Sequence, residues 1–301
     1  MTRSAAIRQL MLEERGGSLA SPHPEPERAA PAREASLRHV WAGTGETVLL
    51  LHGSADTGAL WRPAVKALQP LYRVGTPDLI GYGGSPGWRA QSRYGIDSEI
   101  DALAPLLPDY AEKYHLVGHS YGGLVALMLA LADPVRVRTL TLIEPVFIPA
   151  LRYDGRDAAL DRFRALADAF IAALADGNAE AAMRQFIDFW VRKGAWDEAS
   201  ATQRTALVRS ADKIAREWRA AFAVDTDLRR LAGLGPRTLL LCGERSPTAM
   251  HCMIDALHRL MPGSTRVVVP GAGHTLPATH ADEMVRAIMW HLHVDAERRV
   301  R

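Results

Sequence analysis

The sequence predicts an α/β protein with a mostly parallel sheet that is covered by helices on both faces. From Leu37 onward, short runs of β-branched residues or leucine alternate with patterns of helical spacing, which is typical of this architecture. The chain has 301 residues, of which 48% are hydrophobic and 23% charged, so it can bury a core of substantial size. Metal ions or disulfides are therefore not needed to hold the fold together.

Six strands and four helices are expected along the chain, because apolar runs of strand length alternate with segments whose apolar residues have helical spacing. The predicted strands are 47–51, 72–76, 115–117, 139–143, 238–242 and 265–269. The predicted helices are 60–68, 121–132, 249–261 and 279–293.

One interval breaks this alternation. Between the fourth and fifth predicted strands no further strand-like run occurs, and apolar residues recur at helical spacing. We therefore expect a helical cap inserted over 147–232, which splits a core made of 37–146 and 233–301. Residues 1–36 are poor in large apolar side chains and contain a stretch rich in proline, glutamate and alanine, so we expect a flexible N-terminal extension there.

The insertion contains three of the seven tryptophans, Trp190, Trp196 and Trp218. Aromatic residues at helical spacing usually belong to a core. An insertion that covers one end of a sheet also encloses a pocket, however, and ligand pockets are lined by such side chains. Some of these rings are expected to face a pocket beneath the insertion.

The charge balance excludes several classes of partner. The 36 basic and 34 acidic residues leave a formal net charge of +2, which argues against a nucleic acid or an anionic membrane. Two cysteines, Cys242 and Cys252, are typical of a reduced intracellular protein, and neither a secretory signal nor a membrane span is evident. We expect a cytoplasmic protein that acts on a small molecule; its oligomeric state stays open.

The segment Gly118-His119-Ser120-Tyr121-Gly122 lies between a predicted strand and a predicted helix. This is the context of a nucleophile elbow, in which a strained serine projects its hydroxyl above the sheet and small residues two positions away relieve crowding. Ser120 is therefore the candidate nucleophile. Tyr121 follows it at the helix N-terminus, where its backbone N–H points to the place at which an oxyanion would form.

The first predicted strand leads into His52-Gly53-Ser54, and together with the elbow this segment resembles the α/β-hydrolase fold family. The resemblance implies a three-layer fold with a mostly parallel twisted sheet and a helical cap. It also implies that the backbone N–H of Ser54 is the second oxyanion donor. The spacing of these residues does not by itself show that the Ser54 N–H points toward an oxyanion. The alternative is that His52-Gly53-Ser54 is a simple turn that ends the strand. The segment 78–85 resembles a D-x-x-G-x-G-x-S loop of the same family, which implies a mainly structural role.

His274 is the candidate general base, which a serine hydroxyl needs to become a good nucleophile near neutral pH. It lies in a glycine-rich loop after the last predicted strand, and its place after the nucleophile fits the order of this fold. Residues 270–274 also resemble the histidine loop of the family. His52 and His119 are expected to hold local structure. Because no metal-ligand spacing occurs, we expect neither a metal nor a cofactor.

The third residue of the predicted triad departs from the family pattern. Where most relatives have an aspartate after the penultimate strand, this chain has Ser246, and a hydroxyl cannot stabilise an imidazolium as a carboxylate does. Glu144 is the favoured acid, because it follows the fourth predicted strand at the edge where strand ends converge. Its spacing from Ser120 resembles that of members with the acid after this strand. Glu244 is the alternative acid, and a third interpretation makes Glu144 a solvated or capping carboxylate.

These residues predict a serine hydrolase that cleaves a carboxylic ester or related acyl bond of a small, mainly apolar substrate through an acyl-enzyme. Dehalogenation and epoxide opening in this fold use a carboxylate nucleophile, so Ser120 argues against both. Two alternatives stay open. One is an acyltransferase or cofactor-free perhydrolase with the same triad, and the other is a non-catalytic ligand-binding member of the fold, which the departure at Ser246 favours.

Overall fold

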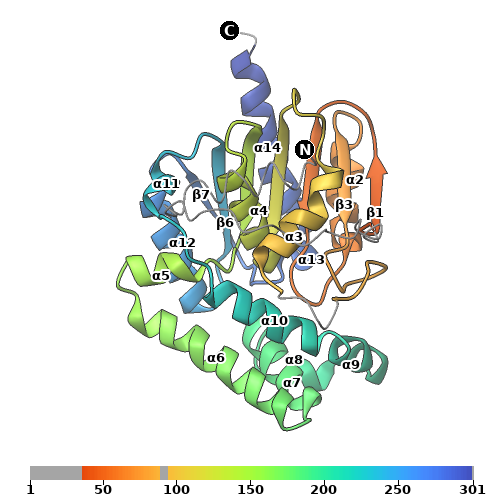
Figure 1. Cartoon of the computed structure of the whole chain (residues 1–301), viewed down its shortest axis with the longest axis vertical. Helices are drawn as coiled ribbons and strands as arrows, with labels where there is room; N and C mark the ends of the chain where they lie inside the picture. The colour runs from red at the N-terminus through yellow and green to blue at the C-terminus, as the bar shows by residue number, and fades with distance from the viewer. Residues whose placement is uncertain (1–35, 89–93, 300–301) are drawn as a thin grey trace, which may run out of the picture.

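A seven-stranded sheet forms the centre of the computed structural model, which describes residues 36–88 and 94–299, with the side chains of the last helix described as far as His293. The strand order is β1-β3-β2-β4-β5-β6-β7, and every neighbouring pair is parallel except β1 with β3 (Figure 1). The strands are β1 (His39–Ala42), β2 (Thr47–Leu51), β3 (Arg73–Pro77), β4 (Tyr114–His119), β5 (Val137–Ile143), β6 (Arg237–Gly243) and β7 (Thr265–Val269).

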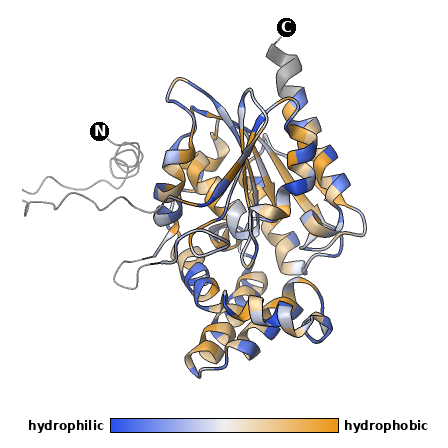
Figure 2. Cartoon of the chain, turned by 90° about the vertical axis from the view of Figure 1, so that its right-hand side faces the viewer, coloured by the Kyte–Doolittle hydropathy of each residue, from blue (hydrophilic) through white to orange (hydrophobic). Residues whose placement is uncertain are grey.

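Helices cover both faces of the sheet, which confirms the predicted three-layer α/β fold; Figure 2 shows the strands between the two helical layers. Because side chains of a strand alternate between faces, β2 contributes to two separate cores. Leu49 and Leu51 pack into the core on one face, and Val48 and Leu50 into the core on the other. The first face carries α3 (Ile96–Leu103), α4 (Ser120–Ala132) and α12 (Thr248–Leu260), and the second α2 (Arg62–Leu68) and α14 (Ala281–Arg299).

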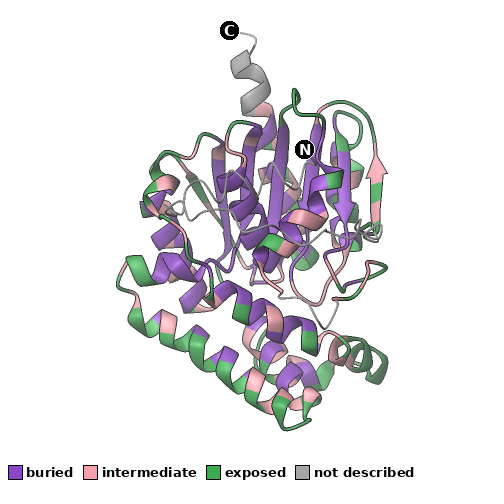
Figure 3. Cartoon of the chain, viewed as in Figure 1, coloured by how far each residue is buried: buried purple, intermediate pink, exposed green. Residues whose placement is uncertain are grey.

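The helix α4 is the most enclosed of the covering helices. All 13 of its residues are buried, and it has no polar face (Figure 3). A helix that is apolar all round needs partners on every side. Here the partners are β4 and β5 on one side and α3 and α10 (Ala211–Phe222) on others, so the first residue of α4 is fixed firmly against the sheet.

Each of the six predicted strands is present, with ends within two residues of the prediction, and the four predicted helices are present as well. Two elements, β1 and α3, were not predicted from the sequence. The strand β1 has only four residues, pairs antiparallel at the sheet edge and has no buried residue, so it lacks the longer buried run by which the parallel strands are found. Three short elements complete the core: η1 (Gly58–Trp61), η2 (Ala104–Leu106) and α13 (Leu276–Thr279).

The chain between β5 and β6 is helical, and most of these helices lie together at one end of the sheet in Figure 1, whereas the last of them lies beside α12. They are α5 (Ile148–Tyr153), α6 (Asp157–Ala175), α7 (Ala179–Trp190), α8 (Ala195–Glu198), α9 (Ala201–Val208), α10 and α11 (Arg229–Ala232). The predicted extension 1–36 lies outside the described residues except for Ser36. None of the helices described is both long and apolar enough to cross a membrane.

Candidate active site

Ser120 occupies a sharp turn between β4, which ends at His119, and α4, which begins at Ser120 itself. Its φ is +54°, a strained left-handed conformation for a residue with a side chain. The flanking glycines explain how the turn fits. A Cβ on Gly118 would lie 2.3 Å from the Gly122 carbonyl oxygen, and a Cβ on Gly122 would lie 2.3 Å from the His52 carbonyl oxygen. Only glycine allows the strand and helix to approach this closely.

The structure brings together Ser120, His274 and Glu144 from three different strand ends. The Ser120 Oγ lies 3.1 Å from His274 Nε2, and His274 Nδ1 lies 2.6 Å from Glu144 Oε2. All three side chains are buried. Since one imidazole nitrogen faces the hydroxyl and the other faces the carboxylate, a proton can pass from Ser120 to His274 while the charge that forms is stabilised by Glu144.

Glu144 is held in this orientation by groups from β6 and the turn after it. Its Oε1 accepts hydrogen bonds from the Gly243 N–H at 2.7 Å and from the Ser246 hydroxyl, which leaves Oε2 for His274. Burial by itself would raise the pKa of Glu144. The hydrogen bond and charge of His274, with the bonds from Ser246 and Gly243, lower that pKa to about 2. The carboxyl is therefore ionised at neutral pH.

Ser246 thus supports the acid from the position where the family pattern has the acid itself, and this role was not predicted from the sequence. The alternative acid, Glu244, lies elsewhere. Its Oε2 accepts a hydrogen bond from the Gly271 N–H at 2.8 Å on the exposed side of the loop, whereas His274 Nδ1 faces Glu144.

The two histidines of the flanking motifs bond to backbone groups. His52 accepts a hydrogen bond from the Leu79 N–H at its Nε2 (2.9 Å), so its Nδ1 donates to the Gly53 carbonyl (2.7 Å). The Nε2 of His119 donates to the His274 carbonyl at 2.9 Å and ties the elbow to the histidine loop. Burial, and then the nearby His274, lower the pKa of His119 to about 3, so its ring is neutral near pH 7.

This buried neutral histidine makes the fold sensitive to acid. His119 binds a proton near pH 6.5 when unfolded and only near pH 3 when folded, so the unfolded state binds more protons between these values. The free energy of unfolding is expected to fall as the pH is lowered through this window, by up to ~1.4 kcal/mol per pH unit from this one group. Urea denaturation at several pH values from 4 to 7 measures how steeply the free energy of unfolding depends on pH. The variant His119→Gln should show a weaker dependence. Equal slopes for the two proteins would contradict the assignment.

Ser54 and Tyr121 both lie at the cavity beside Ser120. Tyr121 is the second residue of α4, where backbone N–H groups have no partner within the helix. The loop that carries Ser54 passes close to the elbow, because a Cβ on Gly53 would lie only 2.9 Å from the Ser120 Cβ. Both residues predicted to donate to an oxyanion are thus next to the candidate nucleophile.

The cavity at Ser120 is small and is lined mainly by apolar side chains. The ring of Trp190 stacks on the His274 imidazole with centroids 3.9 Å apart and excludes water from one side of it. The prediction that some tryptophans of the insertion face a pocket is confirmed for Trp190 and Trp218, whereas Trp196 is buried away from the cavity. The apolar lining residues are Val146, Phe186, Trp190, Ile214, Trp218 and Ala221.

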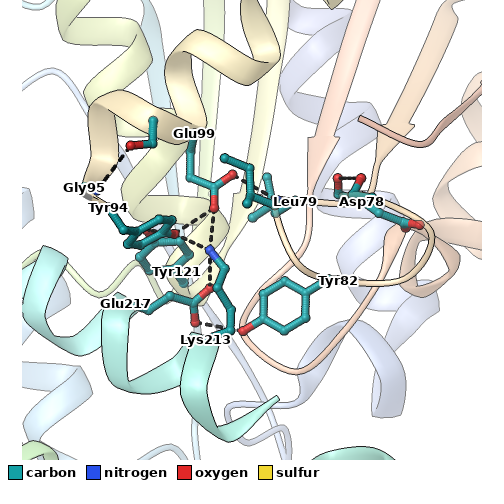
Figure 4. A network of polar contacts seen from close by, with 12 residues as sticks. Asp78, Leu79, Tyr82, Tyr94, Gly95, Glu99, Tyr121, Lys213 and Glu217 are labelled. Atoms are coloured by element: carbon teal, nitrogen blue, oxygen red, sulfur yellow. Dashed lines mark hydrogen bonds and ion pairs between the residues drawn. The ribbon is translucent and has the colours of Figure 1, made fainter. Parts of the chain in front are cut away.

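A buried polar cluster next to the cavity was not anticipated from the sequence (Figure 4). Lys213 from α10 donates to Glu99 Oε1 at 2.5 Å and to the Tyr94 hydroxyl, and its Nζ lies 3.3 Å from Glu217 Oε1. The Tyr94 hydroxyl also bonds the Tyr121 hydroxyl at 2.7 Å. The only signal in the sequence was a lysine and a glutamate four residues apart, which ordinarily indicates an exposed helix face.

The fold and the line of side chains from Ser120 through His274 to Glu144 define the class of enzyme, a hydrolase with a serine nucleophile. The chain belongs to the α/β-hydrolase fold family, whose model matches residues 46–281.

Several relatives with named activities match most of this chain. The pimeloyl-[acyl-carrier protein] methyl ester esterase of Aeromonas hydrophila is 29% identical over 260 residues, which cover 82% of this chain and 95% of that protein. The putative carbamate hydrolase RutD of Yersinia enterocolitica is 28% identical over 252 residues, covering 83% and 88%.

Solved structures share the fold. An esterase from Thermogutta terrifontis has a TM-score of 0.67 at 23% identity, with 86% of this chain and 93% of that chain covered. MenH from S. aureus has a TM-score of 0.69 at 19% identity, with 86% and 98% covered.

Proposed function

We propose that this protein cleaves a carboxylic ester or related acyl bond of a small, mainly apolar substrate through an acyl-enzyme. The observation that carries the proposal is the unbroken line from the Ser120 hydroxyl to the His274 imidazole and on to the ionised Glu144. Relatives named as esterases support the ester as substrate class.

In the first half of the reaction Ser120 Oγ attacks the substrate carbonyl while its proton passes to His274 Nε2. The resulting imidazolium is stabilised by Glu144 across the 2.6 Å contact to Nδ1. His274 then returns the proton to the leaving alcohol, and Ser120 stays acylated. In the second half water gives its proton to His274 and attacks the acyl carbon, which releases the carboxylic acid and restores the Ser120 hydroxyl.

The negative charge on the carbonyl oxygen needs donors that are in place before the reaction. The backbone N–H groups of Ser54 and Tyr121 are proposed to supply them. Loss of one such donor typically lowers kcat about 10²- to 10³-fold. The position of Tyr121 at the start of α4 adds the positive end of the helix dipole.

The helices over 147–232 are proposed to act as a cap that sets the substrate range. Trp190 and Trp218 give the cavity an apolar wall, which favours uncharged acyl or alcohol groups. The formal net charge of +2 fits an enzyme that acts on such molecules in the cytoplasm and has no nucleic-acid or membrane partner.

Labelling with a fluorophosphonate tests the assignment of Ser120. The folded protein is expected to take up one phosphonyl group on Ser120, detected by mass spectrometry of the peptide, because only an activated serine reacts readily. Acid-unfolded protein serves as the control and should stay unlabelled. A folded protein without an adduct on Ser120 would refute the proposal.

A further inference from the structure

We propose that Glu217 forms a polar subsite in the Ser120 cavity that binds a neutral hydrogen-bond donor, such as a hydroxyl group, on the substrate. This inference rests on the proposed function and narrows the class of ester that the site accepts. Among the described residues that line the cavity, Glu217 is the one with a carboxyl group, and the proposed reaction does not use it; Ser54, Ser120 and Tyr121 serve the chemical step.

Glu217 is an unusual member of this wall. It comes from α10 in the proposed cap, only 2% of its surface is exposed, and it lies among apolar side chains such as Ile214 and Trp218. A buried carboxyl group in such surroundings is unfavourable unless its oxygens are hydrogen-bonded. A group of this kind at a substrate cavity is therefore a candidate for substrate recognition.

The two carboxyl oxygens of Glu217 differ in their partners. Oε2 accepts a hydrogen bond from the Tyr82 hydroxyl at 2.9 Å, which fixes the orientation of the group (Figure 4). Oε1 has no hydrogen bond within the part of the chain that the structure describes, although Lys213 Nζ lies 3.3 Å away. The lysine directs its hydrogen bonds to Glu99 and to the Tyr94 hydroxyl instead. Oε1 can therefore accept a further hydrogen bond.

The direction of the pKa shift of Glu217 agrees with its incomplete hydrogen bonding. Burial raises the pKa of Glu217, and the charge of Lys213 together with the hydroxyls of Ser54 and Tyr82 only partly offsets that effect. The carboxyl group is thus less fully stabilised than one exposed to water. A donor from a bound substrate would supply the missing hydrogen bond.

The neighbouring charges decide which donor fits. An ammonium group at Oε1 would approach Lys213, whose Nζ is 3.3 Å from the same oxygen. A carboxylate would face Glu217 itself and the nearby Glu99. A hydroxyl group meets neither repulsion, because it donates a hydrogen bond without carrying a charge.

Matched p-nitrophenyl esters test the subsite. The purified protein is assayed with the hexanoate, the 6-hydroxyhexanoate, the 6-methoxyhexanoate, the 6-ammoniohexanoate and the adipate monoester. We expect kcat/KM for the hydroxy ester to exceed that for the methoxy ester, which lacks the donor, by about tenfold or more. The ammonium and carboxylate esters should be the poorest substrates. No preference for hydroxy over methoxy in the wild-type protein would overturn the proposal.

Variants assign the preference to Glu217. Glu217→Leu should bring the ratio of hydroxy to methoxy ester close to one, while Glu217→Gln, whose amide oxygen still accepts a hydrogen bond, should keep most of it. Glu180→Gln, which removes an exposed carboxyl of the same set of helices, is the matched control and should leave the ratio unchanged.

The outcomes separate this inference from the proposed function. Fluorophosphonate labelling of Ser120 in each variant shows whether the site is folded. Two outcomes overturn the subsite alone. In the first, the hexanoate is hydrolysed but the hydroxy-to-methoxy ratio does not depend on Glu217. In the second, the protein shows a Glu217-dependent preference for the ammonium or carboxylate ester. Absence of both labelling and hydrolysis in the wild-type protein refutes the proposed function and the subsite with it.

Discussion

Replacement of Ser120 by alanine is expected to lower kcat for an activated ester by about 10⁶-fold, the largest effect of any single change in this protein. The substitution removes the atom that forms the acyl-enzyme, the Ser120 Oγ that lies 3.1 Å from His274 Nε2. The oxyanion donors and the cavity stay, so a residual rate of about 10³- to 10⁴-fold over water is expected. Steady-state hydrolysis of p-nitrophenyl butyrate measures the change.

The matched control is Ser264→Ala, which removes a hydroxyl that bonds His258 outside the Ser120 cavity. This variant should keep kcat within about twofold, since surface changes of this kind rarely affect a distant site. Circular dichroism of Ser120→Ala should match that of the wild-type protein. If Ser120→Ala keeps a tenth of the wild-type kcat or more, another nucleophile carries the reaction.

Replacement of Glu144 by glutamine is expected to lower kcat by about 10⁴-fold, because the amide keeps the shape of the side chain but loses the charge that stabilises the imidazolium of His274. The amide can also donate to His274 Nδ1, which would favour the wrong tautomer of the ring. The matched variant is Glu244→Gln. Since Glu244 bonds the Gly271 N–H at the surface rather than His274, its kcat should change by no more than a few-fold.

The pair of variants discriminates between the two candidate acids. KM should move little in Glu144→Gln, because the carboxylate does not line the cavity. The free energy of unfolding of each variant is measured in parallel, since Glu144 is completely buried and its bonds to Gly243 and Ser246 also join β5 to β6. A large loss of kcat in Glu244→Gln with a normal Glu144→Gln would reverse the assignment.

The non-catalytic interpretation of the sequence depended on the missing aspartate at position 246. In the structure Ser246 donates a hydrogen bond to Glu144, and Glu144 contacts His274. The serine at position 246 is thus accompanied by a carboxylate, Glu144, at the end of the neighbouring strand. The two residues can contact each other because β5 and β6 are adjacent and parallel, so residues that follow them meet at the same edge of the sheet.

Local patterns in the sequence were sufficient for the strands, the elbow and the histidine loop. Parallel strands buried on both faces are continuous apolar runs, and the elbow needs glycines at fixed positions because a Cβ would collide with backbone. Both constraints act over a few neighbouring residues. They can therefore be recognised along the chain, as with β2, whose bounds were predicted correctly.

Contacts between distant segments were decided only by the tertiary structure. The burial of Lys213 against Glu99 joins a helix between β5 and β6 to α3, although the two residues are 114 positions apart. The partners of the Glu217 carboxyl group likewise depend on Tyr82 and on the direction of the lysine. A pattern of charges four residues apart looks the same on an exposed helix and on one that faces a neighbour. Burial is what changes its energy, because a desolvated charge must be paired, and burial is a property of the packed chain.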